Sequence, residues 1–572
     1  MPSPQLNATL AEASRVLNFL LTPSELQEYE EALMSHVTNP NAPLRTAIDA
    51  AMSAVGSEEA TSGFRAFLLS RRDPLYQCML ITKVLRTPPG DQVAVAARLL
   101  SRLAIIATDP HRYLSFSPSG APLDPEQASH FLGTTRRVGA KIDTFKPSPS
   151  SRHVVVWSNG AAFALEVLDA AGTPLSEGAL TIVLKEIKIQ SAKLDPAEVS
   201  VASLSWNLSR SDWFEARRAI ESHVENSKSF SRIDTALATI ALEDGVAFSD
   251  PTVQLEAIRT ARGSVNRYAD QVVGLIVYED GFAGLTVDHA PVDGSIVVEF
   301  VNKLYNVPNI PISPESTVFT PLPFVLPPSL PKTFPIDPLN RIVRVTSLGT
   351  LVSQSILANA HKSRLLPFII HMSVQAALLN DPFIPSPLVV QPIAMRHYAG
   401  GRSDPSYSRT AESTALVNAI LDPNTDLSDP RVKILFQQAL ASHKAIIKAA
   451  KVGAGVGWHL RVMNIVAQQN PDIKTNALLR GWGPFSSVGP PMVYVTGFDN
   501  SPGTLYSMSN VYANNMLGCW YNITSGDKEF EISLNIAGSG VFHNDGVLDR
   551  LVNVTSVTFD KLVHLAQVQT PN

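Results

Sequence analysis

Hydrophobic and polar positions follow two different periods along this chain of 572 residues. Through most of the first 110 residues the apolar positions recur with helical spacing, most clearly between residues 92 and 108. Thr22 followed by Pro23 supplies a helix cap and a first helical residue. Beyond about residue 140 the period shortens. Residues 154–157 and 162–167 then predict two strands joined by a hairpin-like turn at Asn159-Gly160.

A segment rich in proline separates two long stretches of mixed helix and strand. Ten prolines fall between residues 307 and 338, a density that excludes a helix or a central strand. We therefore expect two α/β lobes joined by this segment, with a site between them. The other elements that the pattern predicts are a helix near 213–224, strands at 272–278 and 296–300, a buried helix at 367–380, a helix opened by Asp429-Pro430, a strand at 530–534 and a helix at 558–567.

Composition narrows the class of protein. The net charge is −5 and no basic tract stands out, which argues against nucleic acid as a partner. The two cysteines, Cys78 and Cys519, cannot build a disulfide framework and share no metal-site spacing, so we expect no bound metal. So few cysteines suit a reducing cytosol or the lumen of an organelle such as the peroxisome, and of these we expect the cytoplasm. No run of eighteen apolar residues occurs, so no membrane span is expected, and the first residues lack the pattern of a signal peptide.

Candidate chemistry gathers in residues 278–294, YEDGFAGLTVDHAPVDG. A strand runs into a glycine turn, and a second short strand ends at His289 before a proline. A histidine held at a strand end can take and return a proton near neutral pH. Asp293, four residues on, is expected to fix the ring tautomer or to bond a neighbouring arginine, and Gly294 permits a tight backbone path. His289 is thus the candidate general base.

The chain resembles the carnitine/choline acyltransferase family nearly end to end. The matches follow the family's order: residues 2–28, 136–143 (RRVGAKID), 153–169, 266–270 (NRYAD), 284–294 with the histidine motif, 396–404 (RHYAGGRSD) and 517–522 (LGCWYN). Each piece is degenerate, and their order and spacing make the resemblance specific.

This resemblance implies an α/β fold of two chloramphenicol-acetyltransferase-like lobes with an active-site tunnel between them. It implies a helical segment at residues 1–88 that packs with the C-terminal lobe, an N-terminal lobe at 89–330 carrying the catalytic histidine, and a C-terminal lobe at 331–572. His289 would be the base and Asp293 the acidic residue of the family motif. No cofactor would be bound, because the acyl donor arrives as a phosphopantetheine thioester on coenzyme A or a carrier protein.

The departures from the family pattern fall on acceptor-binding positions. The family's aspartate-arginine pair, whose arginine binds the carnitine carboxylate, is replaced by Gly457-Trp458. Tryptophan cannot pair with a carboxylate as arginine does. The family's tyrosine falls at Val390, and Ser403 alone keeps a hydroxyl. We infer that carnitine is not the acceptor. The neighbouring His459 is expected to be a buried structural histidine bonded to backbone.

Two further departures concern the donor and the oxyanion. The two lysines that bind the nucleotide in the family are replaced by Leu357 and His361, although Lys362 and Arg364 lie nearby as substitutes. The family's serine-threonine-serine aligns with Val495-Thr496-Gly497, which leaves Thr496 as the hydroxyl donor and glycine in place of the oxyanion serine. Loss of one such donor costs about 10²–10³ in rate.

One class of family relatives fits these losses together. Certain fungal highly reducing polyketide synthases release their product with an acyltransferase of this type, moving the chain from an acyl carrier protein domain to an alcohol or polyol. Such an enzyme needs the base but neither the carnitine arginine nor the nucleotide lysines. The alternatives are an acyl-CoA-dependent enzyme with a small alcohol, amine or carnitine acceptor, and a non-catalytic relative that binds acyl chains or a partner protein.

Overall fold

The computed structural model describes most of the chain, and its contacts divide it into two compact units. The described residues are 6–54, 65–78, 80–117, 120–195, 198–245, 249–306, 311–313, 317–334, 342–384, 387–457, 459–460, 463, 466–467, 491–499, 503–509, 515–525 and 530–567. One unit, here the histidine unit, comprises Phe64–Leu339 with Asn500–Tyr512. The other, the terminal unit, comprises Met1–Gly63, Asn340–Asp499 and Ala513–Asn572. Residues 64–88 thus belong with the histidine unit, whereas the sequence grouped them with the first helices.

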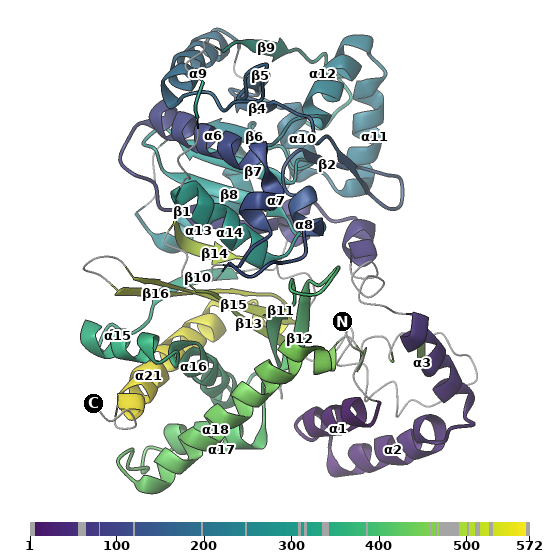
Figure 1. Cartoon of the computed structure of the whole chain (residues 1–572), viewed down its shortest axis with the longest axis vertical. Coiled ribbons are helices and arrows are strands. Elements are labelled where there is room, and N and C mark those ends of the chain that lie inside the picture. Colours follow the sequence, from purple (N-terminus) through teal and green to yellow (C-terminus); the bar gives the residue numbers. More distant parts are fainter. Residues whose placement is uncertain are drawn as a thin grey trace. The chain divides into compact units, whose positions relative to one another are not determined.

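The histidine unit is built on an eight-stranded sheet of order β14-β1-β8-β7-β6-β4-β5-β9 (Figure 1). Its strands β4, β6 and β7 run parallel to one another, and the other pairs are antiparallel. The strands are β1 (Leu80–Leu85), β4 (His153–Ser158), β5 (Ala161–Glu166), β6 (Thr239–Glu243), β7 (Val273–Tyr278), β8 (Ala283–Asp288), β9 (Phe319–Leu322) and β14 (Thr504–Met508), with a separate pair β2 (Thr134–Arg137) and β3 (Thr144–Pro147).

Helices pack on both faces of this sheet because each face presents apolar residues. One face carries a core of β-strand residues with α6, α9 and α14, and the other a core with α10, α11 and α12. The helices of this unit are α5 (Leu75–Cys78), α6 (Gln92–Thr108), α7 (Pro110–Leu114), α8 (Glu126–Ser129), α9 (Glu177–Ser191), α10 (Val201–Asn207), α11 (Arg210–Glu221), α12 (Val224–Asp234), α13 (Pro251–Thr260), η2 (Ala261–Gly263) and α14 (Gly294–Tyr305).

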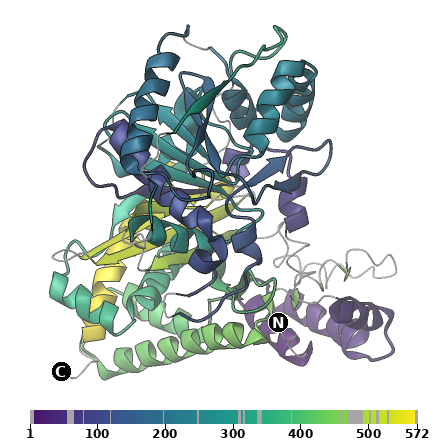
Figure 2. The ribbon, with the colours of Figure 1, turned by 45° about the horizontal axis from the view of Figure 1, so that its top comes forward.

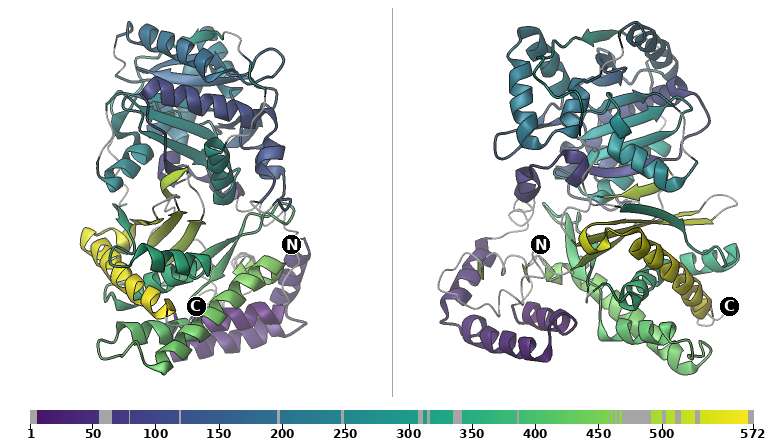
Figure 3. Two further views of the ribbon diagram at one scale, coloured as in Figure 1. Left: turned by 60° about the vertical axis from the view of Figure 1, so that its left-hand side comes forward. Right: turned by 180° about the vertical axis from the view of Figure 1, so that it is seen from behind.

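The terminal unit is built on a six-stranded mixed sheet of order β10-β16-β15-β13-β11-β12. Its strands are β10 (Ile342–Ser347), β11 (Leu388–Ala394), β12 (Ser403–Tyr407), β13 (Met492–Asp499), β15 (Met516–Ser525) and β16 (Phe530–Gly538). A core of apolar residues joins one face of the sheet to α15 (Gln354–Lys362), α16 (Leu366–Asn380), α17 (Ala411–Leu421), α18 (Pro430–Ala449) and α21 (Asp545–Gln567), of which α16 and α21 can be followed in Figure 3. The turns η3 (Ala450–Ala454) and η5 (Gly540–Phe542) complete this part.

The N-terminal helices belong to the terminal unit. They are α1 (Leu6–Leu17), α2 (Pro23–Leu33), the turn η1 (Met34–Thr38) and α3 (Pro43–Ala54). Arg15 on α1 donates to the carbonyl of Tyr407 at 2.9 Å, and Thr22 caps α2 with a complete capping box. The Arg15 bond holds α1 against the end of β12.

Most elements that the sequence predicted are present. The helix at 92–108 is α6, which begins after the cap residue Asp91, and the helix opened by Asp429-Pro430 is α18, visible along its length in Figure 2. The turn between β4 and β5 has positive φ at Asn159 and Gly160, as a tight hairpin requires. In the described part of the proline segment the strand is β9, which lies at the sheet edge. No helix of the described ranges has the length and apolar character needed to cross a membrane.

The strand predicted at 296–300 is wrong, because these residues lie in α14. The run of Ile296, Val297 and Val298 has the β-branched composition of a strand. Its buried positions, however, recur with helical spacing, and packing of this stripe on the core overrides the local preference. Asp293 caps the helix, so the histidine motif leads directly from a strand into a helix.

Candidate active site

His289 follows the last residue of β8, a central strand of the histidine unit. β8 pairs with β1 on one side and β7 on the other, and Asp288 lies opposite Leu80. The tight turn between β7 and β8 uses Gly281, whose φ is +83° and whose added Cβ would come 2.2 Å from the carbonyl oxygen of Gly90. His289 therefore directly follows a strand that is paired with another strand on each side.

The ring of His289 is fixed by its own turn. Its Nδ1 lies 2.8 Å from the carbonyl oxygen of Val292. A carbonyl can only accept, so Nδ1 donates, and the neutral ring then carries its lone pair on Nε2. The side chain keeps 17% of its surface exposed. Nε2 is thus the nitrogen prepared to receive a proton.

Asp293 lies close to the histidine but does not set its tautomer. Its Oδ1 is 3.9 Å from His289 Nε2, beyond hydrogen-bond distance, and accepts from the backbone N–H of Gly294 at 2.9 Å. The backbone N–H of Asp293 donates to Gln127 Oε1 at 2.8 Å. The predicted tautomer-fixing role therefore falls to Val292. What Asp293 supplies is a negative charge that favours the ring once it is protonated.

Asp288, directly before the histidine, begins a chain of buried ion pairs. It accepts from the backbone N–H of Ala290 at 2.8 Å and pairs with Arg136 at 3.2 Å. Arg136 also donates to Asp143 at 2.8 Å and to the carbonyl of Leu68 at 3.0 Å, and its side chain is fully buried. Arg136 thus binds Asp288, the residue directly before the histidine.

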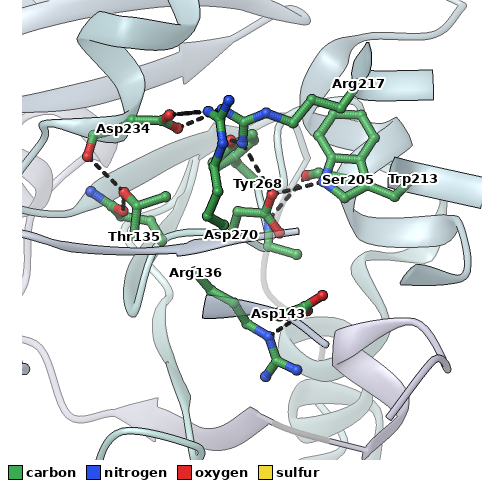
Figure 4. Close-up of polar contacts among 12 residues, drawn as sticks. Thr135, Arg136, Asp143, Ser205, Trp213, Arg217, Asp234, Tyr268 and Asp270 are labelled. Atoms are coloured by element: carbon green, nitrogen blue, oxygen red, sulfur yellow. Dashed lines mark hydrogen bonds and ion pairs between the residues drawn. The ribbon is translucent and has the colours of Figure 1, made fainter. Parts of the chain in front are cut away.

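The chain of charges continues away from the histidine toward α11 and α12. Asp143 also pairs with Arg210, which in turn pairs with Asp270. Arg217 binds both Asp270 and Asp234 (Figure 4). Opposite charges alternate along it, as buried charges require in order to offset the loss of hydration. The network anchors the strand segment at 134–147 to the turn that holds His289.

In the terminal unit, three predicted site residues share one face of the sheet. Val390 lies opposite Tyr494, Thr496 lies opposite Trp520, and Ser403 lies opposite Ala394. Because side chains alternate along a strand, Val390, Ser403 and Thr496 point to the face opposite the one that packs on α16. Trp520, on the same face, would collide with a Cβ added at Gly518, so its indole lies along β15.

Gly497 lies on the other face of β13, beside Tyr521. It is one residue from Thr496, so the two positions face opposite sides of the sheet. An added Cβ at Gly497 would come 2.3 Å from the ring of Tyr521 and 2.5 Å from its hydroxyl. The space that a serine would use is filled by Tyr521, which explains why glycine stands there.

The glycine run before His459 packs against β12. An added Cβ at Gly455 would come 2.6 Å from the carboxylate of Asp404, and one at Gly457 would come 2.4 Å from the carbonyl of Pro405. No larger residue, aspartate included, fits at 457 without a backbone shift. Trp458 lies outside the described residues. His459 is buried as expected, but its Nδ1 bonds the hydroxyl of Thr9 at 2.5 Å rather than backbone, and burial lowers its pKa to about 4.

The positions predicted to contact a nucleotide lie at the end of α15. Leu357 is buried in the core, His361 is half-buried, and Lys362 and Arg364 are exposed. Arg364 has φ of +59°, the left-handed conformation typical of a residue just beyond a helix end. Two cations are therefore presented to solvent here, while the first of the family's lysine positions belongs to the core.

Several residues of this site were not singled out by sequence reasoning. Val292 acts through a backbone carbonyl, which leaves no sequence signal, and Gln127 comes from a distant helix. Asp288 does have a signal in the sequence, because a carboxylate at the end of an apolar strand needs a buried partner. In the part of the chain that the structure describes, no three histidine, cysteine or acidic side chains cluster to hold a metal ion.

Comparison with known proteins gives one family and several relatives. The family model described as choline/carnitine O-acyltransferase matches residues 1–539. Carnitine O-acetyltransferase of Columba livia is 26% identical over 374 residues, 61% of this chain and 58% of that protein. The human muscle isoform of carnitine O-palmitoyltransferase 1 is 24% identical over 371 residues, 61% of this chain and 47% of that protein. Choline O-acetyltransferase of Gallus gallus is 24% identical over 425 residues, 68% of this chain and 65% of that protein.

Solved structures with similar chains include a chloramphenicol acetyltransferase, with 8% identity over 39% of this chain and 89% of that chain at a TM-score of 0.24. The first condensation domain of the CDA synthetase has 12% identity over 89% of this chain and 94% of that chain at a TM-score of 0.38. This chain spans only about half to two-thirds of the length of the curated relatives it matches. Because the family model matches residues 1–539, well over half of the sequence, the chain belongs to the choline/carnitine O-acyltransferase family.

Proposed function

We propose that this protein transfers an acyl chain from a phosphopantetheine thioester to a hydroxyl group, with His289 as the general base. The observation that carries the proposal is the bond from Nδ1 to the Val292 carbonyl, which leaves Nε2 as the basic nitrogen. Membership of a family whose named relatives transfer acyl groups supports the same chemistry.

In the proposed reaction the His289 ring first accepts a proton and later returns it. Nε2 takes the proton from the acceptor hydroxyl as its oxygen bonds to the thioester carbonyl carbon. The negative charge moves to the carbonyl oxygen, where the Thr496 hydroxyl and backbone N–H groups stabilise it. The carbon–sulfur bond then breaks, and the proton passes from Nε2 to the leaving thiolate. Asp293 stabilises the imidazolium that exists between the two proton transfers.

For the acceptor we propose an alcohol or polyol rather than carnitine. The position of the family's aspartate is Gly457, where the carbonyl of Pro405 leaves no room for a side chain. Trp458 replaces the carboxylate-binding arginine, and Val390 replaces the tyrosine. A polyol carries no carboxylate and needs no such arginine, whereas an unpaired buried carboxylate would cost roughly 2–5 kcal/mol.

For the donor we propose the acyl carrier protein domain of a polyketide synthase of the fungal highly reducing type. Leu357, at the place of a nucleotide-binding lysine, is buried in the core, which disfavours a nucleotide there. A carrier protein presents the same phosphopantetheine thioester without the adenine nucleotide. Lys362 and Arg364 favour the alternative, an acyl-CoA donor with a small alcohol or carnitine as acceptor, because both cations are exposed at the same helix end.

Intact-protein mass spectrometry of an acylated carrier protein tests the proposal. We expect the acyl group to leave the carrier only when both this protein and a polyol, such as a sugar alcohol, are present, and the ester to form in equal amount. The same assay with acyl-CoA and carnitine is expected to give no product.

Two results would separate the donor assignment from the chemistry. Product from acyl-CoA and the same polyol, with none from the carrier, would replace the donor and keep the base. Full ester formation by His289→Ala would overturn the proposal as a whole, and unchanged circular dichroism of that variant ensures that the comparison is between folded proteins.

A further inference from the structure

The peptide group between Val292 and Asp293 is held at both of its ends. Its carbonyl oxygen accepts the hydrogen bond from His289 Nδ1 at 2.8 Å, and its N–H donates to Gln127 Oε1 at 2.8 Å. The C=O and N–H of a trans peptide point in opposite directions, so Gln127 and the His289 ring lie on opposite sides of one planar group. Gln127 therefore ends a chain of two hydrogen bonds that begins at the candidate base.

The start of α14 offers no side chain of its own for this N–H. Asp293 is the cap residue of the helix, and in a capping box the third helical residue turns a glutamate or glutamine side chain back to the cap N–H. The residue at that position here is Ile296, whose side chain is apolar and buried. Gln127, which lies 166 positions from Asp293 in the sequence, supplies the missing acceptor.

Gln127 is itself fixed in position. It lies on α8 and is 2% exposed. Phe131, just beyond α8, packs on Phe300 of α14 with ring centroids 4.7 Å apart, which holds the two segments together. A backbone N–H can only donate, so the amide of Gln127 must present its oxygen to Asp293. Both the place and the orientation of the acceptor are therefore set.

We propose that Gln127 is a positioning residue for the general base and acts through the Val292–Asp293 peptide. Its oxygen fixes the rotation of that peptide, so that the carbonyl stays aimed at Nδ1 and Nε2 remains the basic nitrogen. The same bond holds the backbone of Asp293, whose carboxylate lies 3.9 Å from Nε2. This role rests on the proposed function of His289 as the base.

The chain of bonds also affects how readily the ring accepts a proton. Hydrogen bonds in a chain polarise one another, with a strengthening of roughly 10–30% per bond. Acceptance by Gln127 therefore makes the Val292 carbonyl a stronger acceptor. A protonated ring gains more from such an acceptor than a neutral ring does. Loss of the Gln127 oxygen should thus lower the proton affinity of His289.

A purely structural role for Gln127 leads to a different result. Pairing of a buried N–H contributes to stability wherever it occurs, and its loss would not change the proton affinity of His289. Gln92 is the matched control, because it is 3% exposed and donates to the carbonyls of Glu243 and Val277 at 2.8 Å each. Val277 pairs with Ala283, at the end of β8 remote from His289.

Titration of His289, followed by NMR of the full chain with selectively labelled histidine, tests the role without any substrate. The signal is assigned by its absence from His289→Ala. Gln127→Met removes the acceptor and keeps an unbranched side chain, and we expect the titration midpoint of His289 to fall by about 0.3–1 pH units. Gln127→Glu keeps an acceptor oxygen and should restore the midpoint at least to that of the unmodified protein. Gln92→Met should leave it unchanged.

The charged and titratable side chains around the turn and α8 are the same in all these variants, apart from the carboxylate that Gln127→Glu adds. They are Asp288, Asp293, Arg136, Arg65, Glu126 and His130. A lowered midpoint in Gln127→Met can therefore be assigned to the missing amide oxygen.

Kinetics of ester formation give the second measurement. Gln127→Met should lower kcat about tenfold with KM nearly unchanged, because the base loses its alignment while the binding surfaces are kept. Gln127→Glu should recover most of that loss. A lowered midpoint in a protein without acyl transfer would keep the effect of Gln127 on the ring and would remove the proposed function instead.

The proposal is overturned if Gln127→Met leaves the His289 midpoint unchanged, as Gln92→Met does, because Gln127 would then be structural only. It is also overturned if Gln127→Glu titrates like Gln127→Met. If Gln127→Met does not fold, Gln127→Asn takes its place, since it withdraws the same oxygen by one carbon–carbon bond. The expected fall in the midpoint is the same, and an unchanged midpoint would again exclude the role.

Discussion

Two histidine environments in this molecule bury imidazole in opposite ways. His289 donates from Nδ1 to a backbone carbonyl and keeps part of its ring exposed beside a carboxylate. His371 and His443, in the terminal unit, are buried against each other with ring centroids 5.3 Å apart. Among the described residues neither nitrogen of His371 has a hydrogen-bond partner. Burial lowers the pKa of His443 to about 4 and, together with His443, holds that of His371 well below its usual value.

The difference shows what equips a histidine to move protons. A ring that donates from one nitrogen to a carbonyl and lies near a carboxylate gains a favourable neighbour when it takes a proton. A ring surrounded by hydrocarbon loses hydration when it becomes charged, and so stays neutral. The same contrast extends to the surroundings: the histidine unit buries paired charges, whereas the core around His371 and His443 keeps its imidazoles uncharged.

Replacement of His289 should have the largest effect and separates the two histidine environments by activity. His289→Ala should reduce the rate of ester formation by about 10²–10⁴, the usual contribution of a general base, with little change in unfolding temperature. Thiol release from the acyl donor, followed with a colorimetric reagent, measures the rate. His443→Phe is the matched variant in the other environment, and the contrast fails if it loses as much activity as His289→Ala.

Breaking the ion-pair chain that begins at Asp288 should strongly lower the free energy of unfolding. Arg136→Met leaves Asp143 and Asp288 buried with fewer partners, and we expect the free energy of unfolding to fall by about 3–5 kcal/mol in denaturant titrations. Adding Asp288→Asn should recover part of that loss, because it removes one uncompensated charge. Arg218→Met, at an exposed pair, should cost less than about 1 kcal/mol.

Acid should destabilise the terminal unit through His443. Its pKa is about 4 in the folded protein and 6.5 in an unstructured peptide, so between these values the unfolded chain binds more protons. The free energy of unfolding therefore decreases as the pH falls from 6.5 to about 4, by about 3 kcal/mol from this residue. His443→Phe should flatten that part of the profile measured by denaturant unfolding. His543→Gln, at an exposed histidine, should leave it unchanged, and an equal slope in all three proteins would refute the assignment.

Asp293→Asn should have the smallest effect of the four. Asparagine caps a helix as well as aspartate does, so α14 should keep its start. Loss of the charge 3.9 Å from Nε2 should lower kcat about tenfold, with KM nearly unchanged. The pH profile of kcat should shift as well, because the protonated ring loses a favourable neighbour. An unchanged profile would limit Asp293 to capping the helix.

Local signals in the sequence were sufficient for elements whose pattern agrees with their packing. The helix at α6 has both its cap and its apolar stripe in the sequence, and the hairpin of β4 and β5 has Asn159-Gly160. His289 could be selected because a strand, a proline and a glycine surround it in the sequence. The same reasoning failed at residues 296–300, where composition favoured a strand and the buried stripe of α14 favoured a helix.

The sequence by itself determined the family, the two sheet-containing units and the identity of the candidate base. Tertiary structure decided how that base is held: Val292 fixes the tautomer, and Arg136 reaches Asp288 across 152 positions of sequence. It also decided that Thr496 and Gly497 face opposite sides of a sheet, with Tyr521 filling the space at the glycine. Contacts between distant residues and the choice of sheet face depend on how strands pair in space, which no local pattern specifies.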